Sequence, residues 1–95
     1  MPVVTKSSPT KLTAIIERGE RCFVAVCPEL DLATQGETLN DALDDLIDMV
    51  IEYAEEYQAE FKLYHNSPNR AGHWPYLEKV IKEGLEKSKV RSLFN

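Results

Sequence analysis

Apolar and polar residues alternate over three short stretches near the start of the chain, which predicts three strands. The first stretch has Leu12, Ala14 and Ile16 on one side, and the second is richer in apolar residues, so we expect it to be central. Pro28 ends the second strand because proline has no amide hydrogen to donate to a sheet. The stretches are residues 11–18, 21–27 and 30–35.

From residue 39 onward the apolar spacing changes to alternating threes and fours, which is typical of an amphipathic helix. Thr38 is the expected N-cap, and Gly36 is expected to break the preceding strand by adopting a conformation that a Cβ disfavours. The helix is longer than a short sheet, so we expect its aromatic end to pack against the C-terminal segment or a second subunit. The apolar positions are Leu39, Leu43, Leu46, Val50, Tyr53, Tyr57, Phe61 and Tyr64.

The pattern predicts an α+β fold, with a three- to four-stranded antiparallel sheet covered by one long amphipathic helix, and a short C-terminal helix. Pro75 favours the start of that second helix, in which Trp74 serves as a buried anchor. The predicted organisation is a flexible N-terminal arm, a domain, and a loop with a helical extension and basic tail. Their ranges are 1–10, 11–64 and 65–95.

Charge is distributed unevenly along a chain whose net charge is -5. Residues 29–60 contain eleven acidic residues and no Lys or Arg, whereas the bases lie at both ends. Such an acidic middle repels nucleic-acid phosphates and suits a basic protein partner. We expect the basic tail either to solvate a helix end or to pair with this acidic face. Seven acids fall on the helix side opposite the apolar stripe, namely Asp41, Asp44, Asp45, Asp48, Glu52, Glu55 and Glu56.

The sequence offers no convincing catalytic constellation, metal-ligand spacing or cofactor motif. The helix acids are expected to point away from the sheet, so they cannot converge with a strand carboxylate such as Asp31 around a divalent ion. His65 and His73 have no diagnostic ligand spacing. The apolar runs are too short for a membrane span. Cys22 and Cys27 are expected to be small buried hydrophobes, which favours a reducing, cytoplasmic location.

Three pieces of sequence together resemble the HicB-like antitoxin family over about residues 11–64. The pieces are Pro28-Glu29-Leu30, Thr34-Gln35-Gly36-Glu37-Thr38 and Asp41-Ala42. The resemblance implies a trimmed RNase H-like β-β-β-α unit without the nuclease carboxylates. It also implies an antitoxin of a type II pair that binds and blocks a HicA-type toxin, a small basic mRNA-cleaving ribonuclease, without catalysis. Residues 66–95 leave too little room for the helix-turn-helix of many relatives, so the chain is similar to a short, stand-alone member.

Several interpretations of these residues stay open. The acidic face is either a toxin-binding surface or only a solvated face, and exposed sheet edges favour a homodimer or higher homo-oligomer. The chain is alternatively an orphan self-assembling module or, more weakly, a DNA-binding autorepressor that uses its basic tail. The predicted partner-binding residues are Glu29, Asp31, Glu37, Asp41, Asp44, Asp45 and Asp48. The predicted structural motif residues are Pro28, Gly36 and Thr38.

Overall fold

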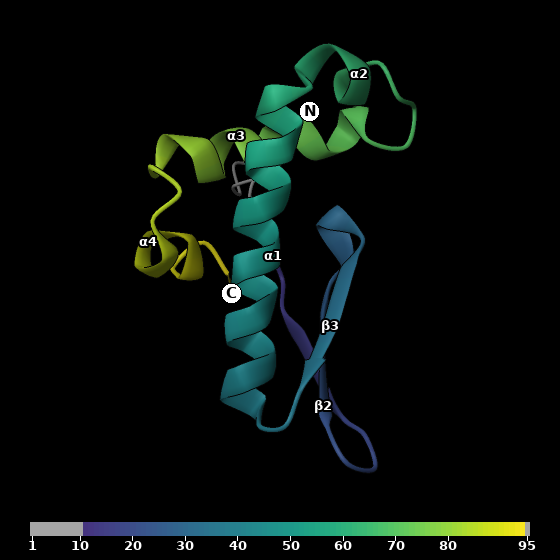
Figure 1. Ribbon diagram of the computed structural model, residues 1–95, viewed down its shortest axis with the longest axis vertical. Coiled ribbons are helices and arrows are strands. Elements are labelled where there is room, and N and C mark those ends of the chain that lie inside the picture. Colours follow the sequence, from purple (N-terminus) through teal and green to yellow (C-terminus); the bar gives the residue numbers. More distant parts are fainter. Residues whose placement is uncertain (1–10, 95) are drawn as a thin grey trace, which may run out of the picture.

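A computed structural model describes residues 11–94, so the predicted arm at 1–10 lies outside the described residues. Three strands form one antiparallel sheet in the order β1-β2-β3, which confirms the predicted α+β fold. A long helix, α1, covers one face of this sheet, and the shorter helices gather around its C-terminal half and side (Figure 1). The strands are β1 (Ile15–Arg18), β2 (Phe23–Cys27) and β3 (Leu32–Gly36).

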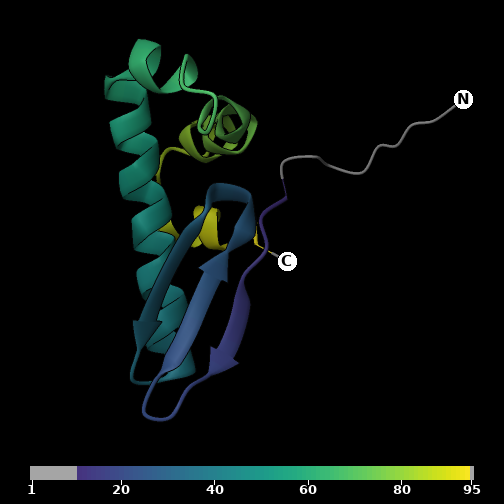
Figure 2. The same ribbon diagram turned by 90° about the vertical axis from the view of Figure 1, so that its right-hand side faces the viewer.

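Side-chain alternation decides which face of the sheet α1 covers. Ala25 and Cys27 of β2 are completely buried beneath the helix. Val26, between them, aligns with Ile15 of β1 and Ala33 of β3 on the opposite face. Ile15 is 43% exposed, and Figure 2 shows that no described helix covers this outer face.

A short 3-10 helix, η1 (Pro28–Leu30), separates β2 from β3. Pro28 occupies its start and ends β2, as predicted. Because η1 takes up these residues, β3 begins at Leu32 and not at the predicted residue 30. Asp31 joins the two elements in a left-handed conformation, with φ at 58°.

The helix α1 (Leu39–Ala59) begins at the predicted N-cap but is shorter than predicted. The Thr38 hydroxyl accepts a hydrogen bond from the Asp41 amide at 3.0 Å. The expectation of one helix through residue 64 is wrong, since the backbone leaves helical geometry at Glu60 and resumes in α2 (Phe61–His65). This break lets the aromatic end fold onto the C-terminal segment, where the Tyr57 and Trp74 rings stack 5.4 Å apart.

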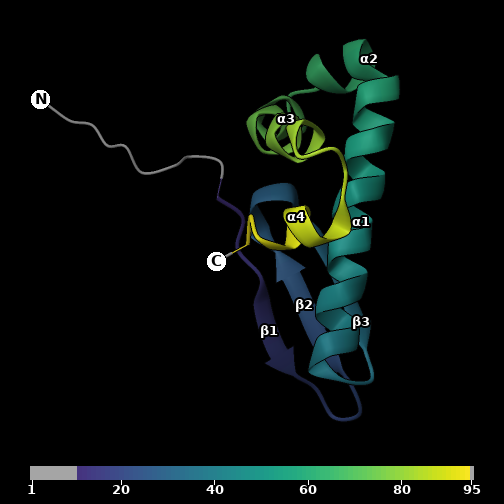
Figure 3. The same cartoon turned by 90° about the vertical axis from the view of Figure 1, so that its left-hand side faces the viewer.

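The C-terminal segment contains η2 (Ala71–His73), α3 (Trp74–Lys82) and α4 (Lys87–Arg91). Gly84 and Leu85 both have positive φ, so the helical conformation of α3 does not continue through them. Beyond α4 the chain returns to its beginning, where the Leu12 amide donates to the Leu93 carbonyl at 3.0 Å. Figure 3 shows α4 beside α1, with the residues directly after α4 close to the segment that leads into β1.

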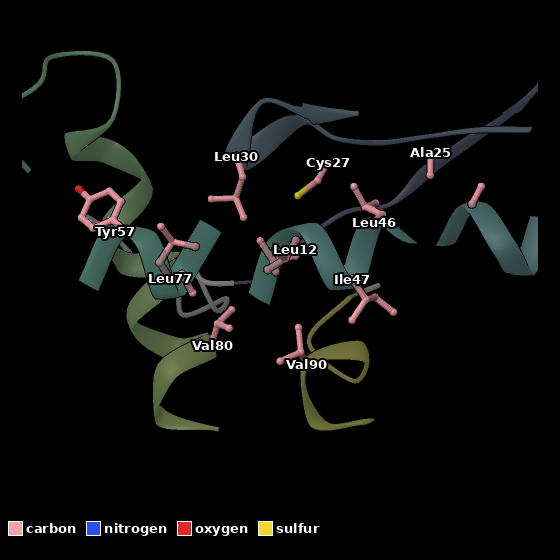
Figure 4. Packing of buried hydrophobic residues seen from close by; sticks show 13 residues of the cluster. Leu12, Ala25, Cys27, Leu30, Leu46, Ile47, Tyr57, Leu77, Val80 and Val90 are labelled. Atoms are coloured by element: carbon pink, nitrogen blue, oxygen red, sulfur yellow. The ribbon is translucent and has the colours of Figure 1, made fainter. Parts of the chain in front are cut away.

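One hydrophobic core joins the sheet, α1 and the C-terminal helices. Leu12, Leu77 and Val90 are each completely buried within it, although they come from distant parts of the chain. Figure 4 shows these side chains packed around α1 with Leu46, Ile47 and others. None of the helices within residues 11–94 is long and apolar enough to cross a membrane.

Candidate functional site

The acids of α1 form an outward-facing band that we name the acidic stripe. Its members lie opposite the buried stripe of Ala42, Leu46, Val50 and Ala54, as the helical spacing predicted. All are exposed except Asp48, which is half-buried. The stripe consists of Asp41, Asp44, Asp45, Asp48, Glu52, Glu55 and Glu56.

One flank of the stripe is already occupied by a base from α4. The Lys87 ammonium lies 2.8 Å from the Asp44 carboxylate and 3.1 Å from that of Asp48. Hydrogen bonds to Asp44 and then Asp48 raise the pKa of Lys87. The tail thus pairs with the protein's own acidic face, one of the two expected outcomes, and leaves these two acids less available to a partner.

The other acids near the start of α1 also have contacts within the protein. Asp45 accepts a hydrogen bond from the Thr34 hydroxyl of β3, and the Asp41 amide is held by the N-cap. Glu52 and its neighbours farther along α1 differ, because none of their carboxylates has a hydrogen bond or ion pair within residues 11–94. These acids are Glu52, Glu55 and Glu56.

The Glu29 carboxylate, a predicted partner contact, is engaged inside the protein. One oxygen accepts from the Thr13 amide at 3.0 Å and the other from the Thr13 hydroxyl at 2.7 Å. Burial opposes ionisation of Glu29, but these hydrogen bonds prevail and lower its pKa. Glu29 therefore ties the segment before β1 to η1.

The Cys27 thiol, at the end of β2, is buried, and this burial raises the pKa of Cys27 to about 11.

The predicted motif residues act through packing and hydrogen bonding. Gly36 has no positive φ, so the expected conformational reason for glycine is wrong. A Cβ at Gly36 would instead lie 2.6 Å from the Ala42 nitrogen and 2.9 Å from the Asp41 carbonyl carbon. Glycine is thus required because β3 ends against the first turn of α1. Glu37, between β3 and α1, is exposed.

A hollow of about 520 Å³ lies between η1, the start of β3, the C-terminal half of α1 and the loop before α3. Predicted site residue Asp31 lines it together with Glu52 and Glu56 of the stripe. The expectation that the helix acids cannot approach Asp31 is therefore wrong, because α1 extends past β3 to the turn that carries this residue. Its remaining lining comprises Leu30, Leu32, Met49, Tyr53, Asn69, Arg70 and His73. The hollow therefore joins one predicted residue of the turn to the part of the stripe that has no internal partner.

Aromatic and basic side chains form one wall of this hollow. The Tyr53 hydroxyl lies 2.7 Å from the Nδ1 atom of His73. The Arg70 guanidinium lies over the rings of Tyr53 and Tyr64, at 5.5 Å and 4.7 Å from their centroids. Burial, assisted by the charge of Arg70, lowers the pKa of His73 despite the opposing charge of Asp31. Burial raises the pKa of Tyr53.

Sequence reasoning did not identify Tyr53, Arg70 or His73 as site residues. Tyr53 fits the apolar stripe of α1, while the other two lie in a loop with no periodicity. The available signal was the concentration of Asn69, Arg70 and His73 directly before Trp74, but it does not specify which helix they meet.

Within the described part of the chain, no group of three or more His, Cys, Asp or Glu side chains is placed to hold a metal ion. The hollow instead combines carboxylates with tyrosine and aliphatic side chains. Such a lining suits a cation that carries an apolar stem.

Comparisons with known proteins agree on one class. A crystal structure from Syntrophomonas wolfei subsp. wolfei, described as an antitoxin part of a candidate toxin/antitoxin system, is similar with a TM-score of 0.81 and 28% identity. The similarity covers 92% of this chain but only 62% of that protein. No curated protein matches the chain. Residues 4–94 match the PHD-like family, described as "Antitoxin of toxin-antitoxin, RelE / RelB, TA system". Because this match spans nearly the whole chain, the protein belongs to that family of antitoxins.

Proposed function

We propose that this antitoxin binds a small basic toxin in the cytoplasm and blocks it without catalysis. The observation that carries the proposal is the acidic stripe, in which Glu52, Glu55 and Glu56 have no partner within residues 11–94. Like charges on one helix face repel one another, so their accumulation costs stability unless a basic partner relieves it. The stripe steers and orients such a partner more than it supplies affinity.

The motif resemblance and the family description suggest two kinds of toxin. The HicB-like pieces at residues 28–30 and 34–38 favour a HicA-type ribonuclease. The family description favours a RelE-type toxin. In either case we propose that the antitoxin covers the surface that the toxin uses for its own substrate.

Co-expression with any small basic protein that is encoded next to this chain tests the proposal. We expect the two to co-purify and the toxin's RNA cleavage to stop when the antitoxin is added in equal amount. A triple variant, Glu52→Gln, Glu55→Gln and Glu56→Gln, should bind at least tenfold more weakly at low salt. Its matched control neutralises Glu17, Glu20 and Glu78, which changes the net charge equally, and should stay within threefold. Equal affinities for both triple variants would contradict the proposal.

A second candidate function is self-assembly without a toxin. Its support is the outer face of the sheet, which none of the described helices covers and where Ile15, Val26 and Ala33 form an apolar row across the strands. Light scattering of the isolated protein tests this candidate. A dimer that becomes monomeric in Ile15→Glu, with no basic protein co-purifying, would favour self-assembly over toxin binding.

A further inference from the structure

We propose that the hollow beside α1 is the socket for an arginine side chain of the toxin. This inference rests on the proposed function and adds to it the place and chemistry of the main contact. It predicts that the toxin docks at the C-terminal half of α1, against η1 and the loop before α3. A cavity, its charge and the composition of its walls support this location independently.

The charge of the hollow favours a cation. Asp31 enters from the turn after η1, while Glu52 and Glu56 enter from successive turns of α1. Arg70 is the one side chain with a permanent positive charge among the lining residues, so the carboxylates outnumber it. None of the three carboxylates has an internal hydrogen bond or ion pair in the part of the chain that the structure describes.

The walls suit the rest of an arginine side chain. Leu30, Leu32 and Met49 supply apolar surface for its three methylene groups. Tyr53 supplies an aromatic ring, on which a planar guanidinium stacks better than an ammonium. Arg70 demonstrates this chemistry within the protein, since its guanidinium lies over Tyr53 and Tyr64, and no carboxylate among residues 11–94 is in ion-pair range.

The N-terminal half of the stripe is a poorer docking site for the same chemistry. Asp44 and Asp48 already share the Lys87 ammonium, and Asp45 accepts from Thr34. A basic side chain arriving there must displace an existing cation or compete with a hydrogen bond. At the hollow it meets carboxylates without internal partners.

A small-molecule titration tests the socket without any toxin. The probe is N-acetyl-L-arginine amide, and the control is the citrulline analogue, which has the same shape but no charge. We expect the backbone amide signals of Met49 and Tyr53 to shift saturably with the arginine compound, with a dissociation constant on the order of millimolar. The double variant Glu52→Gln/Glu56→Gln should lose at least threefold in affinity, whereas Glu55→Gln, outside the hollow on the same stripe, should not. Equal shifts with both compounds, or none with either, would overturn the inference.

A second experiment measures the affinity of the same double variant for the toxin. With the co-purified toxin, the double variant Glu52→Gln/Glu56→Gln should bind at least tenfold more weakly. The control Glu17→Gln/Glu78→Gln changes the net charge equally at exposed positions outside the stripe and the hollow, and should bind less than threefold more weakly. If wild-type protein binds no toxin but still binds the arginine compound, the proposed function fails while the cation socket stands. If it binds toxin and all three proteins have equal affinity, the toxin docks elsewhere and the inference is wrong.

Discussion

At the residue scale, Gly36 is required by its surroundings and not by its own backbone angles. A methyl group there would meet backbone atoms of Asp41 and Ala42 at 2.6 to 2.9 Å, which the helix can relieve only by moving. We expect Gly36→Ala to lower the free energy of unfolding by about 2 kcal/mol. Urea unfolding followed by circular dichroism measures this. Gly72→Ala is the control, because a Cβ there has open space within 4 Å, and its change should be within about 0.5 kcal/mol.

Glu29 makes the stability of the fold depend on pH. Its pKa is lower in the folded protein than its ordinary value, so the carboxylate stabilises the fold above about pH 4.3. That contribution is lost as the pH falls through the lowered pKa. We expect Glu29→Gln to cost about 1 kcal/mol at pH 7, given its hydrogen bonds with Thr13.

Urea unfolding of wild type and Glu29→Gln at pH 7 and pH 3 checks this dependence. The difference between the two proteins should shrink at pH 3, because the unfolded protein, in which Glu29 has its ordinary pKa, takes up a proton below about pH 4.3. The exposed Glu17→Gln is the control and should behave like wild type at both values. A difference that is the same at pH 3 as at pH 7 would show that ionisation of Glu29 does not stabilise the fold.

At the scale of single elements, Thr38 decides where α1 starts. Its hydroxyl satisfies the Asp41 amide, one of the first-turn groups that have no partner inside the helix. Thr38→Ala should therefore lower the free energy of unfolding by about 1 kcal/mol. Thr38→Ser keeps the hydroxyl and should recover most of the loss. Thermal unfolding of wild type, Thr38→Ala and Thr38→Ser distinguishes two causes. Loss of the cap destabilises only Thr38→Ala, whereas loss of the Thr38 methyl group would destabilise both variants equally.

The elements also show how far sequence patterns reach. The start of α1 was predictable because Thr38 and the apolar spacing after it are local signals. The end of α1 was not predictable, because the break falls at Glu60, where the sequence has neither glycine nor proline. The break depends on the ring contacts that Tyr57 and Phe61 make with Trp74. Likewise pairing with the acidic face was one of two outcomes expected for the basic tail, but no pattern indicated the helix α4 that carries Lys87.

At the scale of the whole molecule, the site was the least predictable feature. The acidic stripe follows from helical periodicity alone. The hollow does not, because Asp31, Glu56 and His73 come from three segments that only the tertiary fold brings together. Periodicity shows which side of α1 faces outward, but it cannot show which flank is neutralised by Lys87 and which keeps carboxylates without an ion pair among residues 11–94.

The shared core implies that the C-terminal segment unfolds together with the sheet. Val90 of α4 and Leu12 are both completely buried in this core. The Leu12 amide also donates a hydrogen bond to the carbonyl of Leu93, which follows α4. Val90→Ala should cost about 2 kcal/mol through lost burial and the cavity left behind. The exposed Lys89→Ala is the control and should change stability by less than about 0.5 kcal/mol.

Trp74 is the one tryptophan of the chain and stacks on Tyr57, so its fluorescence follows the C-terminal segment. Circular dichroism follows the sheet and α1. In Val90→Ala both signals should move to the same lower urea midpoint, because one cooperative unit has one transition. Movement of the fluorescence midpoint alone would show that the sheet and α1 fold without the C-terminal helices.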